Sequence, residues 1–184
     1  MRLSAPRIPA LTPEQWSAEA TEILAPLVTH GTDINIFRTL ANYPDLMRRW
    51  LVFTNHVLFK SALSARVREF LILRIGFLCG SDYQWGQHVV LSRAAGLTSD
   101  DYRAIKLGPS ASNIDVIDRL VLQAADELNA DNFVTDATWQ ALSAHFNRHQ
   151  LMDIVFTVGQ YKLVAMMLNT FGVQLDRGLP GFDV

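Results

Sequence analysis

Apolar residues recur along this 184-residue chain every three to four positions, which is the period of an α-helix. No segment shows the apolar–polar alternation of a β-strand more strongly than this helical period. Ser, Thr, Asn or Pro precedes most of the apolar stretches, as is typical of helix starts, and Gly follows several of them. The pattern therefore predicts an all-α fold, a helical bundle.

Capping residues and breakers divide the first half of the chain into helices. The expected segments are a helix from Thr12-Pro13 to about Val28, helices over about 34–41 and 44–59, one from Ser64 to Gly80, one from Ser81 to Gly96, and a short one from Thr98. Residues 106–110, Lys-Leu-Gly-Pro-Ser, resemble a linker. We therefore expect a single domain over 1–184, with an N-terminal half (1–107) and a C-terminal half (110–184).

The second half repeats this organisation. Helices are expected over about 114–128, from Thr135 to about His145, and from Asn147 to Gly172. The last of these is apolar on most of its circumference, which predicts a central position or a subunit interface. The irregular tail around Phe182 carries an apolar residue that needs a docking surface.

The most informative polar residue is Glu69, a carboxylate inside an otherwise apolar helical stretch. An unpaired charge in an apolar interior is costly, so Glu69 needs a partner. The nearest candidate is His88, nineteen positions later and inside the next predicted helix. An acid–imidazole pair can act as a proton relay. The alternative is a buried ion pair with a structural role only.

Two further polar residues share a helix face with His88. Ser81 and Gln84 fit a capping box, Ser81-x-x-Gln84, at the start of that helix. The positive end of the helix dipole there favours an anion, so these residues either cap the helix or hold a substrate oxygen. Trp85 and Tyr83 are expected to pack in the core or to form a pocket wall.

The single cysteine, Cys79, excludes an internal disulfide and a Cys-based zinc site. It is interpreted as a small apolar residue or, alternatively, as a peroxidatic thiol, which would need a low pKa, exposure and an external resolving thiol.

His145, His149 and Asp153 are spaced by four, as metal ligands on one helix face would be. Asn147 reads as an N-cap between the histidines, so no metal site is predicted.

Three arginines, Arg66, Arg68 and Arg74, flank Glu69. They are expected to be salt-bridge partners or a solvated edge, although one could bind a substrate carboxylate through two hydrogen bonds.

Charge and hydropathy argue against several kinds of partner and location. The net charge of −2 gives no electrostatic reason to expect nucleic acid or an anionic membrane as a partner. No uncharged apolar run approaches the ~18 residues of a membrane span, and the first residues lack the apolar region of a signal peptide. A cytoplasmic location is the resulting expectation.

The stretch from about 35 to 105 resembles the carboxymuconolactone decarboxylase family, which includes the AhpD-type alkylhydroperoxidases. The residues that carry the resemblance are Arg68-Glu69, the apolar helix, the step to His88, and Gly96-Leu97-Thr98. Residues 156–161 and 172–175 are similar to the second half of longer members. The resemblance implies an AhpD-like all-α bundle without a cofactor, assembled as a homo-oligomer (dimer, trimer or hexamer).

The peroxidase branch of that family carries Cys-x-x-Cys twelve and fifteen residues after the glutamate, where this chain has Ser81 and Gln84. The decarboxylase branch lacks the cysteines and keeps the glutamate and histidine. The leading expectation is therefore a lyase that moves protons on a small carboxylated metabolite through Glu69 and His88, with Ser81, Gln84 and Trp85 binding substrate. The alternatives are a peroxiredoxin-like thiol peroxidase using Cys79, or an oligomeric member without catalysis.

Overall fold

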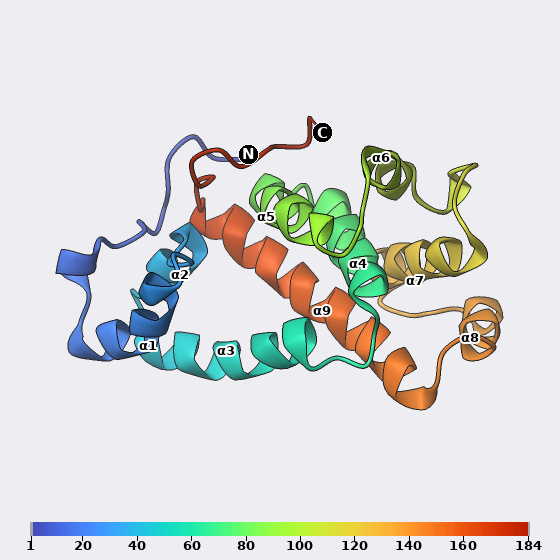
Figure 1. Cartoon of the computed structure of the whole chain (residues 1–184), viewed down its shortest axis with the longest axis horizontal. Helices are drawn as coiled ribbons and strands as arrows, with labels where there is room; N and C mark the ends of the chain where they lie inside the picture. Colours follow the sequence, from blue (N-terminus) through green and yellow to red (C-terminus); the bar gives the residue numbers. More distant parts are fainter. Residues whose placement is uncertain (1, 184) are drawn as a thin grey trace.

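A computed structural model describes residues 2–183, which fold into nine α-helices and two short 3-10 helices without a β-strand (Figure 1). The α-helices are α1 (Ala18–Thr29), α2 (Asn35–Leu40), α3 (Pro44–Phe59), α4 (Ala65–Leu78), α5 (Asp82–Arg93), α6 (Ser99–Leu107), α7 (Val116–Asp131), α8 (Asp136–Ser143) and α9 (Arg148–Phe171). The predicted all-α fold is confirmed.

Helix α9 runs diagonally through the molecule, between α3 on one side and α4 and α5 on the other (Figure 1). Helix α4 packs against α5, α7 and α9 and is enclosed on nearly all sides, with Phe70, Leu71 and Ile72 fully buried. A polar side chain on α4 therefore has to find its partners inside the protein.

Local capping explains most of the helix starts. The side chains of Ser64, Thr98, Thr135 and Asn147 each accept a hydrogen bond from the backbone N–H three residues later. Helix α3 spans Pro44–Phe59, as its sequence predicts.

The single helix expected from Thr12 to Val28 is wrong. A 3-10 turn, Pro13–Gln15, comes first, and α1 starts separately after Ser17, whose side chain accepts from the N–H of Ala20. The second N-cap ends the first element because a capping residue adopts an extended backbone.

The two sequence halves contribute to one hydrophobic core, because α4 packs against both α7 and α9. The linker-like stretch forms a 3-10 turn, Gly108–Ser110, which packs against α6 and α7. The division into halves at residues 107 and 110 stays a prediction.

By length and composition alone, α9 could cross a membrane, with a mean hydropathy of 1.4 in its most apolar window. The sequence does not predict this from uncharged runs, because Asp153 and Lys162 lie within the helix. Half of that window is buried in the bundle, as is usual for a core helix.

The C-terminal tail lies against α5. The carboxylate of Asp176 accepts hydrogen bonds from Tyr83, from Gln87 and from the backbone N–H of Asn35. Further on, Phe182 packs against Phe77 and Trp85, with ring centroids 5.5 and 5.6 Å apart. The apolar tail residue thus docks within its own chain.

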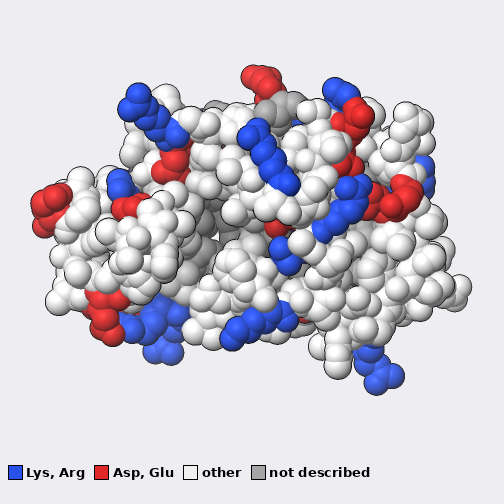
Figure 2. All heavy atoms as spheres, viewed as in Figure 1, with Lys and Arg blue, Asp and Glu red and all other residues white. Residues whose placement is uncertain are grey.

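Acidic and basic side chains are interspersed on the face of the molecule shown in Figure 2, and neither sign forms an extended patch there. This distribution agrees with the small net charge of −2.

Candidate active site

The structure brings Glu69 of α4 and His88 of α5 into direct contact. The Nδ1 atom of His88 lies 2.7 Å from Oε2 of Glu69. Both residues are buried, with exposed fractions of 3% for Glu69 and 6% for His88. The contact expected from the cost of burying an isolated acid is confirmed.

A tight connection places the two helices side by side. Gly80 adopts the left-handed conformation, with φ of +60°, and the N–H of Ser81 bonds back to the carbonyl of Gly76. This arrangement closes α4 and turns the chain so that α5 packs back along it. Glycine suits this position because side chains are strained at positive φ.

The pair fixes which nitrogen of His88 is available for chemistry. An ionised carboxylate only accepts hydrogen bonds, so the short contact assigns the proton to Nδ1. The Nε2 atom is then the one that can accept a proton. The second oxygen of Glu69, Oε1, lies 3.6 Å from Nε of Arg68.

Tyr161 of α9 completes this cluster and is not among the site residues predicted from the sequence. Its ring is perpendicular to the imidazole of His88, with centroids 4.9 Å apart. Burial, followed by the negative charge of Glu69, raises the pKa of Tyr161 well above its usual value, while Arg68 opposes the shift. Tyr161 is therefore a neutral phenol that can donate a hydrogen bond. The feature of the sequence that indicates Tyr161 is a hydroxyl group within the apolar helix predicted over 147–172.

Ser81 and Gln84 do not form the predicted capping box. The side chain of Ser81 makes no cap hydrogen bond, and Nε2 of Gln84 donates instead to the carbonyl of Ile72 in α4, at 3.0 Å. Gly76 leaves room for this amide, because a Cβ atom there would lie 3.0 Å from Nε2 of Gln84. The face of α5 that carries Ser81, Gln84 and His88 is enclosed by α4, so packing across the helices overrides the local motif.

Two buried atoms on this enclosed face, Oγ of Ser81 and Oε1 of Gln84, have no hydrogen-bond partner among residues 2–183. Their predicted contact with substrate stays a prediction.

Trp85 is fully buried, and its ring packs against Phe77, Tyr102 and Phe182. These contacts favour packing as the role of Trp85, and its expected contact with substrate also stays a prediction.

Cys79 lies at the other end of α4 from Glu69. The two residues are ten positions apart in the chain, which corresponds to about 15 Å along the helix axis. Burial raises the pKa of the Cys79 thiol, although Lys162 and Arg2 oppose the shift. A raised pKa disfavours the thiolate, which is the reactive form.

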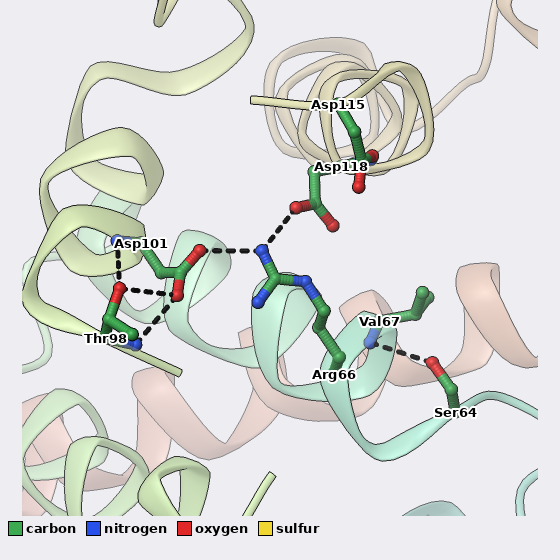
Figure 3. Close-up of polar contacts among 7 residues, drawn as sticks. All are labelled: Ser64, Arg66, Val67, Thr98, Asp101, Asp115 and Asp118. Carbon is green, nitrogen blue, oxygen red and sulfur yellow. Dashed lines mark hydrogen bonds and ion pairs between the residues drawn. The ribbon is translucent and has the colours of Figure 1, made fainter. Parts of the chain in front are cut away.

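The three arginines near Glu69 have different surroundings. Arg66 bridges Asp101 and Asp118, at 2.6 Å from each carboxylate (Figure 3). Arg74 is buried, and it binds both oxygens of Asp126 as well as the carbonyls of Ile105 and Lys106.

Arg68 is different, because its ion pair within residues 2–183 is the 3.6 Å contact with Glu69. Its Nε atom is buried and has no hydrogen-bond partner in this part of the chain. Arg68 is thus the arginine whose guanidinium group faces the Glu69–His88 pair.

The spaced residues His145, His149 and Asp153 do not meet. Asn147 caps α9 between the two histidines, and Asp153 accepts hydrogen bonds from the Ser61 hydroxyl and the N–H of Ala62. Among residues 2–183, no group of three His, Cys, Asp or Glu side chains is placed to hold a metal ion.

Comparison with known proteins assigns the central segment. Residues 44–108, which hold Glu69, Arg68 and His88, match the model of the carboxymuconolactone decarboxylase family. This segment belongs to the carboxymuconolactone decarboxylase family. No curated protein matches the chain.

The family model covers residues 44–108 only, whereas two solved structures are similar to nearly the whole chain. An uncharacterised peroxidase-related protein with an AhpD core from Ralstonia eutropha JMP134 is 21% identical, with a TM-score of 0.80, over 94% of this chain and 93% of that one. An uncharacterised peroxidase-related protein from Silicibacter sp. TM1040 is 16% identical, also with a TM-score of 0.80, over 98% and 95%.

A third structure is a protein of unknown function from Agrobacterium tumefaciens, described as a putative antioxidant defence protein AhpD. It is 18% identical, with a TM-score of 0.68, over 74% of this chain and 94% of that one. The fold is therefore AhpD-like, and these similarities, at 16–21% identity, concern the fold alone.

Proposed function

We propose that this protein is a decarboxylase-like lyase that moves a proton on a small carboxylated metabolite by acid–base catalysis. The observation that carries the proposal is the buried 2.7 Å contact between Nδ1 of His88 and Oε2 of Glu69. A carboxylate in this position orients the imidazole and stabilises the imidazolium that forms when Nε2 accepts a proton.

The proton balance of such a reaction is simple. Nε2 of His88 takes the proton of the carboxyl group that will leave the substrate. As the carbon–carbon bond to the carboxylate breaks, its electron pair moves to a neighbouring carbonyl and CO2 leaves. The imidazolium then returns the proton to the carbon, and Glu69 stays ionised throughout. The residues of the relay are all supplied by the chain.

Tyr161 supports this chemistry from the side of α9. A phenol that stays neutral can donate a hydrogen bond to an oxygen on which negative charge develops. Its ring packs against the imidazole of His88, the group to which this proposal assigns proton transfer.

The main alternative is a thiol peroxidase that uses Cys79, since two of the similar structures are of peroxidase-related proteins. The raised pKa of Cys79 and its distance of about 15 Å along α4 from Glu69 favour the acid–base reaction instead. The remaining alternative is a bundle in which the Glu69–His88 pair has a structural role only.

A two-stage experiment tests the proposal. Small carboxylated metabolites are first screened for a rise in the melting temperature of the full chain, because a ligand that binds the folded state stabilises it. Each hit is then incubated in D2O and followed by NMR for CO2 loss or deuterium incorporation. We expect turnover by the wild type and at least ~100-fold less by His88→Gln. Equal turnover by both proteins would contradict the proposal.

A further inference from the structure

The neighbourhood of Glu69 contains one arginine whose hydrogen-bonding capacity is not used by the fold. Arg66 is held by two aspartates, and Arg74 is held by Asp126 and two backbone carbonyls. Arg68, by contrast, lies 3.6 Å from Oε1 of Glu69, which is longer than a hydrogen bond.

The Nε atom of Arg68 is buried without a hydrogen-bond partner among residues 2–183. A buried donor that is left unsatisfied costs about 1–3 kcal/mol, so a native protein rarely keeps one without a reason. An incoming ligand that accepts this hydrogen bond would remove the cost.

Arg68 is also the most accessible charged group of the cluster. Its side chain is 18% exposed, whereas those of Glu69 and His88 are 4% and 7% exposed. Part of the Arg68 side chain is therefore in contact with solvent, while its Nε atom is buried beside Glu69. The low exposure of its neighbours favours a small ligand.

The chemistry of the guanidinium group selects the ligand. Arginine donates from Nε and one Nη in a planar fork that matches the two oxygens of a carboxylate. Glu69 is already engaged with His88 through Oε2, so it holds the positive charge of Arg68 in place without saturating the fork.

We infer that Arg68 anchors a carboxylate of the substrate, so that the rest of the molecule lies against His88 and Tyr161. This inference rests on the proposed function, because it assigns the substrate-binding residue of the same site. The anchored carboxylate is one that the product retains. Pairing with a guanidinium group stabilises the ground state of a carboxylate and would oppose its departure as CO2. The reacting group is a second carboxyl or carbonyl function on the same molecule.

The inference predicts binding that depends on Arg68 and on the charge of the ligand. Benzoate and acetate are titrated into the full chain by calorimetry, with benzamide and acetamide as neutral counterparts of the same shape. We expect Arg68→Met to bind the two carboxylates at least ~10-fold more weakly, with the amides bound equally weakly by both proteins. Arg68→Lys should recover part of the affinity, because it keeps the charge and loses the fork.

Arg103→Met is the control variant, because Arg103 is an exposed arginine of α6 paired with Asp100. It should bind the carboxylates as the wild type does. Circular dichroism checks that each variant is folded, and Arg68→Lys tests the anchor if Arg68→Met does not fold.

Carboxylate affinity that is unchanged in Arg68→Met, or absent in the wild type at millimolar concentration, would overturn the anchor. Failure of the proposed function has a different signature. In that case carboxylates bind in an Arg68-dependent way, while no ligand is turned over in a His88-dependent way.

Discussion

The carboxylate of Glu69 and the imidazole of His88 lie 2.7 Å apart across two neighbouring helices, with Oε2 facing Nδ1. The contact directs the unprotonated nitrogen of His88, Nε2, away from Glu69 and leaves it available for proton transfer. A variant that keeps the size of the Glu69 side chain and removes its charge measures how much this contact contributes to activity.

Replacing Glu69 with Gln keeps the size of the side chain and removes its charge. If Glu69 holds His88 in its working tautomer, activity should fall by ~100-fold or more, with a similar loss in His88→Gln. The double variant should lose little further activity, because residues that act as a unit are not additive. The ring 15N chemical shifts of His88 report the tautomer directly. Identical shifts in wild type and Glu69→Gln would show that the two groups do not communicate.

Tyr161→Phe removes one hydroxyl group and keeps the ring that packs against His88. We expect about a 10-fold or greater loss of kcat, since a donor to developing negative charge is lost. The melting temperature should change little. Full activity in this variant would limit Tyr161 to a packing role.

Cys79→Ser tests the peroxidase alternative. Because burial raises the pKa of this thiol, little thiolate forms near neutral pH. We expect wild type and Cys79→Ser to reduce an organic hydroperoxide at equal rates, measured with dithiothreitol as the electron donor. A rate that is lost only in the variant would favour the thiol mechanism.

Arg66 should contribute to stability in a pH-dependent way, because it bridges Asp101 and Asp118 (Figure 3). Burial raises the pKa of Asp101, and the larger combined effect of Arg66 and Thr98 leaves it below its usual value. A carboxyl group whose pKa is lowered by folding adds stability above its unfolded pKa, and that stability is lost as the pH falls through the folded pKa.

The pKa of Asp118 is raised, because burial outweighs the effect of Arg66. Ionised Asp118 therefore depends on Arg66 at neutral pH, and without that cation its pKa would rise further. We expect Arg66→Met to cost about 1–3 kcal/mol of unfolding free energy at pH 7, measured by urea denaturation. The difference should shrink as the pH falls through the range in which the aspartates become protonated, with Asp118 protonated before Asp101 because its pKa is raised and that of Asp101 is lowered. Arg49→Met, which removes an exposed pair with Asp45, should cost under about 0.5 kcal/mol.

Self-association through α9 is a further expectation. The exposed side of α9 carries a continuous apolar stripe, and with Phe53 of α3 it lines an apolar groove of about 340 Å³. The residues of the stripe are Met152, Val155, Phe156, Leu163 and Met166. An apolar helix face of this kind can pair with the same face of a second copy about a two-fold axis.

Leu163→Glu places a charge in the middle of this stripe and should shift the protein to monomers in sedimentation velocity at micromolar concentration. Phe133→Glu, at an exposed apolar position outside the stripe, should leave the assembly unchanged. A monomeric wild type at that concentration would contradict the expectation. The tail residue Phe182 is not expected to take part, because it already packs against Phe77 and Trp85.

Local signals in the sequence determined most of the helix starts. Ser64, Thr98, Thr135 and Asn147 cap helices by bonding to a backbone group three residues away, and such contacts depend only on neighbouring residues. The Glu69–His88 contact was also predictable, because an acid in an apolar helix needs a partner and few are near in the sequence. In both cases a polar group that is costly to leave unpaired has few possible partners near it in the sequence.

The tertiary structure decided the rest of the site. Ser81 and Gln84 read locally as a capping box, yet α5 packs so closely on α4 that Gln84 bonds to the carbonyl of Ile72 instead. Tyr161 reaches His88 from α9, more than seventy residues later in the chain. Arg66 and Arg68 are two positions apart on α4, so the helical turn directs one to Asp101 and Asp118 and the other to Glu69. Packing between distant helices fixes such partners, and a single sequence does not encode that packing in any short pattern.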